Sequence, residues 1–417
     1  MAPGRSTAHE ALLRTRHAVE PVLRAAVDTL PDRLRAVAAY HFGWQEADGT
    51  PVGGMGARGF GGAEAVGDAG HAGHAANAGN AGHVGEAGGA GNASGAGNAG
   101  NSGGAGGKLL RPALVLAAAA AVTGPAALAA AHPAALDATI LANAAAVELA
   151  HNFTLLHDDV IDRDHTRRHR PTAWTVFGAE NAILAGDAML ALALRLVTGE
   201  AAARLAECVI EICEGQYEDC AFAACEAVTL DDCLAMAGKK TGALLGCACA
   251  LGALAAHADP AAVVALDLFG REVGMAFQLT DDLLGIWGDP AVTGKPVGSD
   301  LAARKKSLPV VAALAARSAH SAPTAHPIRS VKSTSSTRSA AAAELAELYA
   351  LGRDFTEHEL RRAADAVERA GGRAWAAAEA TARVAKAHAH LGRAPGVHQG
   401  AVHDLRAIAG LITRRSN

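Results

Sequence analysis

The fold is decided by an apolar stretch that ends in carboxylates: Val147–Asp162 reads VELAHNFTLLHDDVID. Residues four apart share one face of a helix, so Asp158 and Asp162 project together, and Asp159 lies one step round the helix. Like charges at this spacing repel each other and destabilise a bare helix. The stretch therefore predicts a helix end at which cations neutralise the carboxylates.

A second pair of carboxylates lies in another apolar helical stretch, Phe277–Gly285, which reads FQLTDDLLG. Its aspartates are Asp281 and Asp282. Clusters of hard carboxylate oxygens favour Mg²⁺, which keeps several waters and bridges protein carboxylates to phosphate groups. Basic residues follow both clusters at short range. The sequence therefore predicts a magnesium site that binds a phosphorylated substrate.

The composition favours helices over strands. Half of the residues are hydrophobic but only 4% are aromatic. Alanine, the best helix former, is abundant, whereas strands prefer β-branched and aromatic residues. We therefore expect an all-α chain, a helical array that buries a sizeable core. The net charge of −5 argues against a general nucleic-acid-binding protein.

Several features bear on the cellular compartment. The seven cysteines form no CxxC pair and no zinc-like array with histidine, which is typical of buried thiols in a reducing cytoplasm. Charged residues occur throughout the N-terminus to Glu20, so it lacks the apolar region of a signal peptide. The alanine-rich stretch 113–131 contains Gly124-Pro125, which indicates a buried helix and its end. We expect no transmembrane segment and a cytoplasmic location.

The chain is expected to form one helical domain with two insertions. Residues 1–52 are its N-terminal helices, residues 108–317 its catalytic core and residues 340–417 its C-terminal helices. Residues 53–107 consist mainly of Gly, Ala, Asn and His, and such a segment buries too little apolar area to offset its ordering entropy, so we expect it to be disordered. Residues 318–339, rich in Ser, Thr and basic residues, predict a second flexible insertion. The first insertion is interpreted as a spacer; its length also raises the hypothesis of a docking partner.

Arginine forks match phosphate oxygens bidentately, so carboxylate-bound metal ions together with arginine form a diphosphate site. On this combination the chain resembles the trans-isoprenyl diphosphate synthases, also called polyprenyl synthetases. The resemblance implies an isoprenoid synthase fold, with helices around a central cavity, and a homodimer. The matching motifs are Gly107-Lys108…Arg111-Pro112, His151 through Arg168 to Arg170-Pro171-Thr172, Gly186-Asp187, Lys240-Thr241, Phe277-Gln278…Asp281-Asp282…Gly288-Asp289-Pro290, and Gly294-Lys295…Asp300…Lys305.

The resemblance implies a prenyltransferase that condenses isopentenyl diphosphate with an allylic diphosphate through an allylic carbocation. About three Mg²⁺ ions would stabilise the leaving diphosphate, and no nucleophilic side chain is needed. The residues implied to hold these ions are Asp158, Asp159, Asp162, Asp281 and Asp282. The other implied roles are Arg167, Lys240 and Lys295 on the allylic diphosphate, Lys108, Arg111, His151 and Arg168 on isopentenyl diphosphate, Thr241 and Gln278 near the cation, and Lys305 as a supporting substrate contact.

Product length in this family depends on the residue five positions before the first motif aspartate, which points down the cavity. Here that residue is Phe153, followed by Thr154. An aromatic side chain at this point would limit growth, so we expect short products of C15 to C20, with geranylgeranyl diphosphate favoured over farnesyl diphosphate. The alternative is that Phe153 belongs to ordinary helix packing and another residue sets the length.

The chain departs from the family pattern at several positions. Gly285 stands where the second motif has its last aspartate. Asp289 follows Asp281 by eight residues, about 80° round a helix, so metal binding is expected to survive with altered affinity. His169 replaces the glycine usual after the arginine pair, and Leu109 replaces a basic residue beside the motif lysine.

Two other functions are compatible with parts of the pattern. A class I terpene cyclase shares the fold and the first motif, but it generally carries an Asn/Ser/Glu triad in place of the second aspartate motif, and it does not need Lys108, Arg111 and Arg168. A non-catalytic synthase-like subunit would dock partners through residues 53–107. Inactive relatives usually lose a metal carboxylate, and Gly285 is the one candidate loss.

Overall fold

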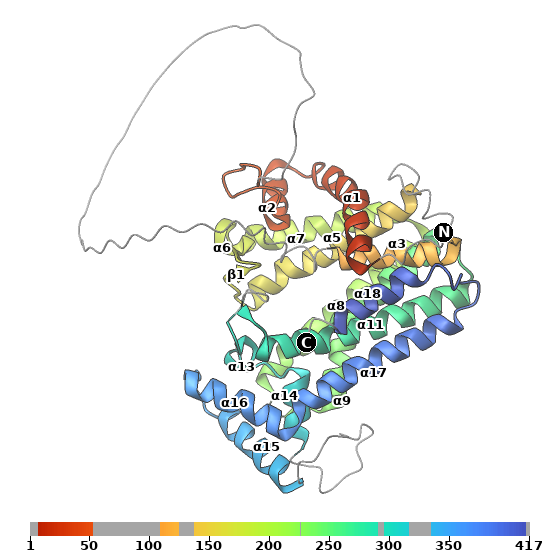
Figure 1. Cartoon of the computed structure of the whole chain (residues 1–417). Coiled ribbons are helices and arrows are strands. Elements are labelled where there is room, and N and C mark those ends of the chain that lie inside the picture. The colour runs from red at the N-terminus through yellow and green to blue at the C-terminus, as the bar shows by residue number, and fades with distance from the viewer. Residues whose placement is uncertain are drawn as a thin grey trace, which may run out of the picture.

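The computed structural model describes residues 7–52, 109–124, 137–225, 227–290, 296–316 and 335–413. These residues form an array of helices in which long helices cross a common core (Figure 1). The helices are α1 (Ala8–Val27), α2 (Asp32–Phe42), α3 (Leu110–Thr123), α5 (Ala138–Ile161), α6 (Ala173–Phe177), α7 (Ala179–Leu196), α8 (Gly199–Ala224), α9 (Leu230–Ala237), α10 (Ala243–Ala255), α11 (Pro260–Trp287), α13 (Ser299–Ala302), α14 (Leu308–Ala315), α15 (Ser335–Tyr349), α16 (Glu357–Ala370), α17 (Gly372–Arg393) and α18 (His403–Thr413), with a π-helical turn, η2 (Gly238–Gly242), between α9 and α10.

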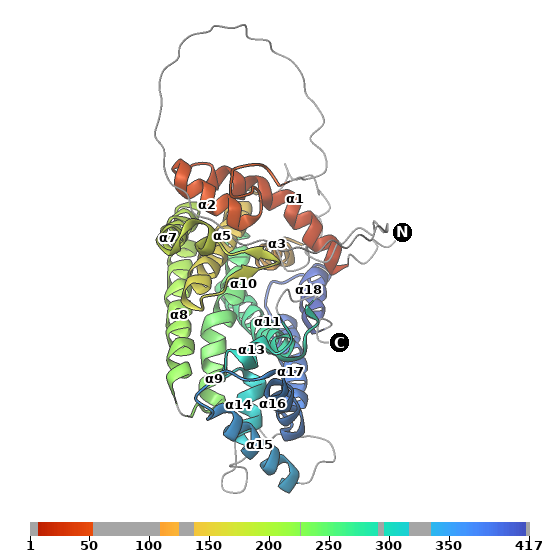
Figure 2. The same cartoon turned by 90° about the vertical axis from the view of Figure 1, so that its left-hand side faces the viewer.

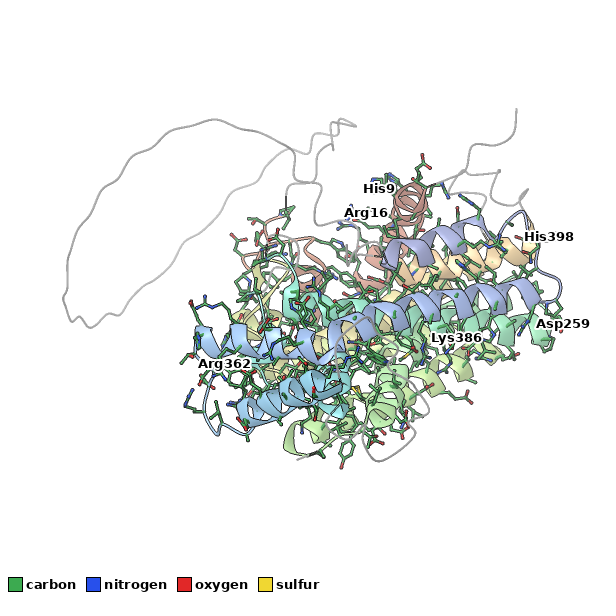
Figure 3. All side chains as sticks on the ribbon, turned by 60° about the horizontal axis from the view of Figure 1, so that its bottom comes forward. His9, Arg16, Asp259, Arg362, Lys386 and His398 are labelled. Carbon is green, nitrogen blue, oxygen red and sulfur yellow. The ribbon has the colours of Figure 1, made fainter. Side chains whose placement is uncertain are left out.

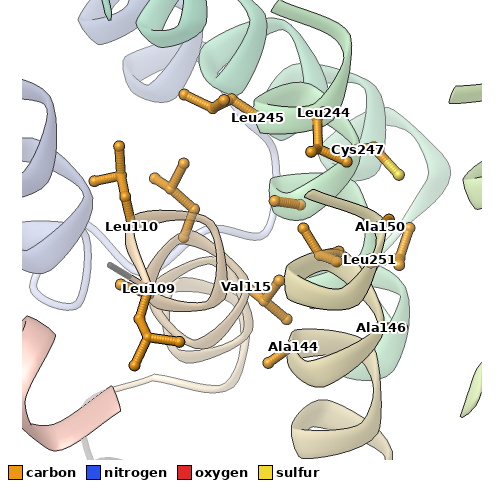
Figure 4. Packing of buried hydrophobic residues seen from close by; sticks show 14 of the residues in the cluster. Leu109, Leu110, Val115, Ala144, Ala146, Ala150, Leu244, Leu245, Cys247 and Leu251 are labelled. Carbon is orange, nitrogen blue, oxygen red and sulfur yellow. The ribbon is translucent and has the colours of Figure 1, made fainter. Parts of the chain in front are cut away.

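The centre of the core is α10, which carries no charged residue and contacts α3, α5, α8 and α11. Small residues let these helices approach closely. A Cβ atom added at Gly252 would lie 3.0 Å from the carbonyl carbon of Val115 and closer to its oxygen, and one at Gly270 would collide with Leu245. Figure 4 shows the resulting contact of α3, α5 and α10, filled by leucine, valine, alanine and cysteine side chains.

Local signals in the sequence explain where the long helices begin. Thr7 and Glu10 form a capping box at α1, and Asp137 caps α5 through the backbone N–H of Thr139. Asp259 caps α11, and Pro260 occupies its first turn, where no N–H is needed. The caps at Asp137 and Asp259 fix the start of the two helices that carry the aspartate clusters.

Two groups of helices lie at opposite ends of the molecule, and the C-terminal helix α18 packs against α1 and α3. Helices α1 and α2 cover α5 and α7 at one end, and α14, α15 and α16 pack on each other at the other end (Figure 2). The outer faces carry charged side chains, among them Arg16 on α1, Arg362 on α16 and Lys386 on α17 (Figure 3). Helix α17 runs along α11 and connects the two ends.

The expected all-α isoprenoid synthase fold is confirmed, with one short exception. Within the described ranges the strands are β1 (Thr166–Arg167) and β2 (Arg170–Pro171), which pair antiparallel. Helix α15 begins at Ser335, so the end of the second expected insertion, residues 335–339, is helical. The first expected insertion, residues 53–107, lies outside the described residues. No described helix is both long and apolar enough to cross a membrane.

Candidate active site

The first aspartate cluster lies at the C-terminal end of α5. Asp162 caps the helix, and its backbone N–H donates to the carbonyl of Asp158 at 2.8 Å. Asp159 is buried, Asp158 is half-buried and Asp162 is exposed. Burial raises the pKa of Asp158, and the nearby cation of Lys240 opposes this shift. Two of the carboxylates therefore reach the surface of the site, while the third points inward.

Asp159 holds the β1–β2 hairpin in place. The guanidinium of Arg167 donates to Asp159 Oδ1 from Nε at 2.8 Å and from Nη2 at 2.7 Å. The turn residues Arg168 and His169 both have positive φ, 54° and 62°, the backbone of a tight two-residue hairpin that favours Asn-Gly or Gly-Gly. The family's usual glycine at 169 suits this turn, and His169 adopts it with backbone strain.

Arg170 fastens the same hairpin to the end of α2. Its guanidinium donates to the carbonyls of Tyr40 at 3.3 Å and Gln45 at 3.1 Å, and to Glu46 at 2.8 Å. It also stacks over the Tyr40 ring, with 4.5 Å between the guanidinium carbon and the ring centroid. The two arginines that precede it in the chain, Arg167 and Arg168, are thereby presented on a rigid loop.

The second cluster lies on α11, where its two aspartates differ in environment. Asp281 is exposed, whereas Asp282 is buried. Asp282 Oδ1 accepts from Gln278 Nε2 at 2.7 Å, and Oδ2 accepts from the backbone N–H of Leu308 at 2.8 Å. Burial raises the pKa of Asp282 to about 7. Asp281 is therefore the more accessible carboxylate for a metal ion, and Asp282 anchors the start of α14.

The expectation that Asp289 continues the helix of Asp281 was wrong. Helix α11 ends at Trp287, and Gly288 follows it with extended backbone angles, φ −69° and ψ 147°. Asp289 therefore does not continue the helical face of Asp281, because Gly288 turns the chain away before it.

The π-helical turn η2 presents the next two candidate residues, Lys240 and Thr241, beside α8. Lys240 donates to Asp219 at 2.6 Å, and the Thr241 hydroxyl donates to Gln278 Oε1 at 2.6 Å. A Cβ atom at Gly215 of α8 would lie 2.5 Å from the backbone nitrogen of Lys240, so only glycine permits this approach. Single π turns inside helices are frequent at functional sites.

Lys305 lies between the two aspartate clusters. Burial alone would lower its pKa, but surrounding carboxylates raise it above the ordinary value. Those carboxylates belong to Asp219, Asp300, Asp282 and Asp162. Because Asp162 is on α5 and Asp282 is on α11, their shared influence on one lysine shows that the fold brings the clusters together.

The residues that flank Lys305 bind two distant helix ends. Arg304 donates to the carbonyls of Tyr349, at 2.8 Å, Leu351 and Arg353, which follow one another at the end of α15. Lys306 donates to the carbonyls of Phe222, at 2.9 Å, and Cys225 at the end of α8. Lys305 is thereby held from both sides.

A second basic group lies deeper, where α3 meets α5. Arg111 is buried, and its Nε has no hydrogen-bond partner among the described residues. Burial lowers the pKa of Arg111 to about 10, and the nearby carboxylate of Glu148 opposes this shift. His151 is kept neutral because burial and the charges of Arg111 and Arg168 hold its pKa well below the usual range. A buried guanidinium N–H without an acceptor can donate a hydrogen bond to a phosphate oxygen.

Phe153 and Thr154 point to different surroundings. The Phe153 side chain is buried and lies edge-on to His157, with ring centroids 5.6 Å apart. His157 in turn contacts α7, where a Cβ atom at Gly186 would lie 2.5 Å from the imidazole Cδ2. The Thr154 hydroxyl donates to the His151 carbonyl at 2.7 Å. Phe153 is thus packed against His157 of its own helix, just before the first aspartate cluster, and it is His157 that contacts α7.

The described part of the site fits Mg²⁺ shared with a substrate. Across those residues no three His, Cys, Asp or Glu side chains converge tightly enough to hold a metal ion by themselves. The accessible donors, Asp158, Asp162 and Asp281, are all carboxylates, the ligand type that Mg²⁺ takes together with water and substrate phosphates.

The structure brings together most of the predicted site residues. Lys108 and Lys295 lie outside the described residues. Two residues near the predicted site residues carried no predicted role. One is Glu148, whose charge within an apolar stretch of the sequence was a signal of such a role. The other is Asp219, which pairs with Lys240. Asp219 lies in an acidic run on α8, and nothing in its spacing distinguishes it from a solvated face.

Comparisons with known proteins agree with this arrangement. Residues 99–347 match the family model for polyprenyl synthetase. A geranylgeranyl diphosphate synthase of Mycobacterium tuberculosis is 44% identical over 311 residues, covering 73% of this chain and 71% of that protein. A (2E,6E)-farnesyl diphosphate synthase of Mycobacterium bovis is 35% identical over 404 residues, covering 95% and 90%.

Solved structures show the same fold. A polyprenyl synthetase from Streptomyces coelicolor A3(2) superposes with a TM-score of 0.72 at 36% identity, covering 97% of this chain and 99% of that one. A geranylgeranyl pyrophosphate synthase from Corynebacterium glutamicum, complexed with isoprenyl diphosphate and magnesium, gives a TM-score of 0.59 at 26% identity, covering 73% and 86%.

Proposed function

The chain belongs to the polyprenyl synthetase family and is a short-chain trans-prenyl diphosphate synthase, and from this premise we propose that its main product is geranylgeranyl diphosphate. The higher identity to a geranylgeranyl than to a farnesyl diphosphate synthase, 44% against 35%, supports this length. So does Phe153, a buried aromatic side chain five residues before the first motif aspartate. The terpene cyclase and the non-catalytic subunit are not retained, since the named relatives are synthases.

The allylic diphosphate is proposed to bind between the two aspartate clusters. The family uses a divalent metal. Mg²⁺ held by Asp158, Asp162 and Asp281 would neutralise the charge that develops on the leaving diphosphate. We place about three ions there, as the resemblance implies. Arg167 and Lys240 add fixed positive charge, and each is oriented by a carboxylate behind it, Asp159 and Asp219 respectively.

Isopentenyl diphosphate is proposed to bind at the deeper basic group. Arg111 offers its unfilled Nε–H, and Arg168 is presented by the strained hairpin turn. The neutral imidazole of His151 can donate one hydrogen bond without adding charge. Glu148 balances the guanidinium charges from behind, as its influence on the pKa of Arg111 indicates. Lys108, which lies outside the described residues, is proposed as a further contact.

Bond formation needs no nucleophilic side chain. Cleavage of the allylic C–O bond leaves a carbocation; the double bond of isopentenyl diphosphate attacks it, and a proton leaves, which we assign to the released diphosphate. The Thr241 hydroxyl donates a hydrogen bond to Gln278 Oε1, so the lone pairs of the hydroxyl oxygen face away from that bond. We propose that they stabilise the cation electrostatically.

A homodimer is proposed on the face formed by α7 and α8. These neighbouring helices lie along one edge of the molecule (Figure 2). Their outer face exposes large apolar side chains, including Leu184 at 54%, Ile210 at 69% and Tyr217 at 75%. Exposed apolar patches on a protein surface mark interaction sites. Sedimentation equilibrium of the wild type and of Ile210→Glu tests this, and a monomeric wild type would remove the proposal.

The product is tested by incubating the enzyme with Mg²⁺, isopentenyl diphosphate and each of dimethylallyl, geranyl and farnesyl diphosphate. Products are dephosphorylated and identified by mass. We expect C20 to dominate from all three primers. A main product of C15, or products that continue well beyond C20, would overturn the proposed length while leaving the family assignment intact.

A further inference from the structure

A buried asparagine on α5 connects a carboxylate of its own helix to a histidine of α2. Asn152 is 2% exposed, and its Nδ2 donates to the Glu148 carbonyl at 2.7 Å and to Glu148 Oε1 at 3.1 Å. Its Oδ1 lies 3.2 Å from Nε2 of His41. The reverse amide orientation would set Oδ1 against two acceptor oxygens. The amide oxygen therefore faces His41, and Nε2 of His41 donates the hydrogen bond.

The carboxylate that Asn152 contacts belongs to the deeper basic group. Glu148 is buried on α5, which packs against α3, the helix of Arg111. Burial lowers the pKa of both Arg111 and Arg168, and the charge of Glu148 opposes each shift. Glu148 is thus a carboxylate near both guanidiniums to which isopentenyl diphosphate is proposed to bind.

Helix α2 holds this group through two consecutive residues. His41 bonds Asn152, while Tyr40 binds the β1–β2 hairpin. The Tyr40 hydroxyl donates to the Pro171 carbonyl at 2.9 Å, and the Tyr40 carbonyl accepts from Arg170 at 3.3 Å. The same hairpin presents one of the two guanidiniums in its turn. One segment of α2 therefore contacts both the hairpin and the helix that carries the carboxylate.

We propose that Asn152 and His41 are positioning residues for the isopentenyl diphosphate site and act through Glu148. The hydrogen bond from His41 fixes the amide, and the amide in turn fixes the Glu148 carboxylate. A guanidinium binds phosphate oxygens well only when its planar fork is held in the matching orientation, and a fixed carboxylate provides that hold. Neither Asn152 nor His41 is proposed to touch the substrate. The inference rests on the proposed isopentenyl diphosphate site.

The test measures binding without turnover. Isopentenyl diphosphate is titrated by calorimetry into the full chain saturated with Mg²⁺ and dimethylallyl S-thiolodiphosphate, whose C–S bond ionises too slowly for turnover. Asn152→Asp keeps the shape and the oxygen toward His41 but replaces the Nδ2 donor by an acceptor. We expect the Kd of isopentenyl diphosphate to rise about tenfold, the order of effect of one lost hydrogen bond to a charged group. The Kd of the thiolodiphosphate, measured separately, should stay within about twofold.

Asn143 provides the matched control on the same helix. It is also 2% exposed, and its Nδ2 donates to the Leu251 carbonyl at 3.0 Å. It precedes Asn152 by nine residues, about 13 Å along α5. Asn143→Asp should lower the melting temperature and leave both Kd values unchanged.

Two variants of His41 test the other end of the connection. His41 is half-buried, so its substitution perturbs folding less than a change at Asn152 and tests the proposal even if Asn152→Asp does not fold. His41→Phe keeps a ring and removes the donor, and it should raise the Kd of isopentenyl diphosphate about threefold. His41→Gln places an amide N–H near the position of Nε2 and should bind like the wild type. Equal binding by the two variants would overturn the role of His41.

A double variant shows whether Asn152 acts through Glu148. In the Glu148→Gln background, Asn152→Asp should raise the Kd of isopentenyl diphosphate much less than it does in the wild type, because the effects of two members of one hydrogen-bond network are not additive. The same increase in both backgrounds would overturn the proposed route through Glu148.

The outcomes distinguish this inference from the function on which it rests. If Arg111→Met leaves the Kd of isopentenyl diphosphate unchanged, the proposed site itself is wrong. If Arg111→Met weakens binding while Asn152→Asp binds like the wild type, the site stands and the positioning role is overturned. An equal loss of affinity for both substrates in Asn152→Asp would show a purely structural role and overturn it as well.

Discussion

Truncation of Phe153 tests whether this side chain closes the product cavity. It is 4% exposed and lies less than two helical turns before Asp158. Phe153→Ala removes a buried ring, which costs about 3–5 kcal/mol of unfolding free energy. The lost ring is similar in size to one five-carbon isoprene unit. In a close-packed interior that space becomes available to the growing chain, so we expect the main product to lengthen by about one unit. Phe153→Leu should cost less and give an intermediate distribution.

Phe269 provides the matched control. It is fully buried in the same hydrophobic cluster, but it lies on α11 twelve residues before Asp281, about 18 Å along the helix. Phe269→Ala should lose a similar unfolding free energy, measured by urea denaturation, without a change in product mass. An unaltered product distribution in Phe153→Ala, or equal lengthening in both variants, would show that Phe153 does not close the cavity.

Three further predictions concern the hairpin, the helix packing and pH. Arg170→Met removes three hydrogen bonds and the stacking of the guanidinium on Tyr40, so it should lose about 2–4 kcal/mol of unfolding free energy. It should also raise the KM for isopentenyl diphosphate more than the KM for the allylic substrate. The control Arg361→Met, at an exposed position, should change neither the stability nor the KM values. Gly252→Ala should lower the unfolding free energy by about 1–3 kcal/mol in urea denaturation, because its Cβ meets the Val115 backbone. Gly392→Ala has open space around it and should raise the unfolding free energy by up to about 1 kcal/mol. The reverse order of stabilities would refute the packing argument. Burial raises the pKa of the folded Asp282 carboxyl to about 7. The contribution of the protonated carboxyl to the stability of the metal-free protein is therefore fully present below about pH 4, where the carboxyl is protonated in both the folded and the unfolded chain. This contribution is lost as the pH rises to about 7. Urea series at several pH values should show this slope in the wild type and a flatter one in Asp282→Asn.

The helices and the two aspartate clusters could be predicted because their signals are local. Helical periodicity placed Asp158 and Asp162 on one face, and the structure has both at the end of α5. The abundance of alanine predicted close helix packing, which is observed where α10 meets α3 and α11. Both properties depend on residues within a few turns of each other.

Long-range contacts could not be predicted in this way. Asp219 and Lys240 come together because α8 packs against η2, and a solitary carboxylate on an acidic helix carries no mark of such a partner. The approach of Asp300 to Gly285 depends on how the chain returns after α11. Asp289 was misplaced because helical geometry was extended beyond Trp287, where the helix ends.

The contacts on either side of Lys305 have a consequence for how long the site stays assembled. Arg304 and Lys306 bind carbonyls at the ends of α15 and α8, so fraying of either helix end releases one of the two neighbours of the lysine. Helix ends open more often than a whole domain unfolds. The time for which Lys305 stays in place between the aspartate clusters is therefore set by the opening rates of two helix ends in different parts of the molecule.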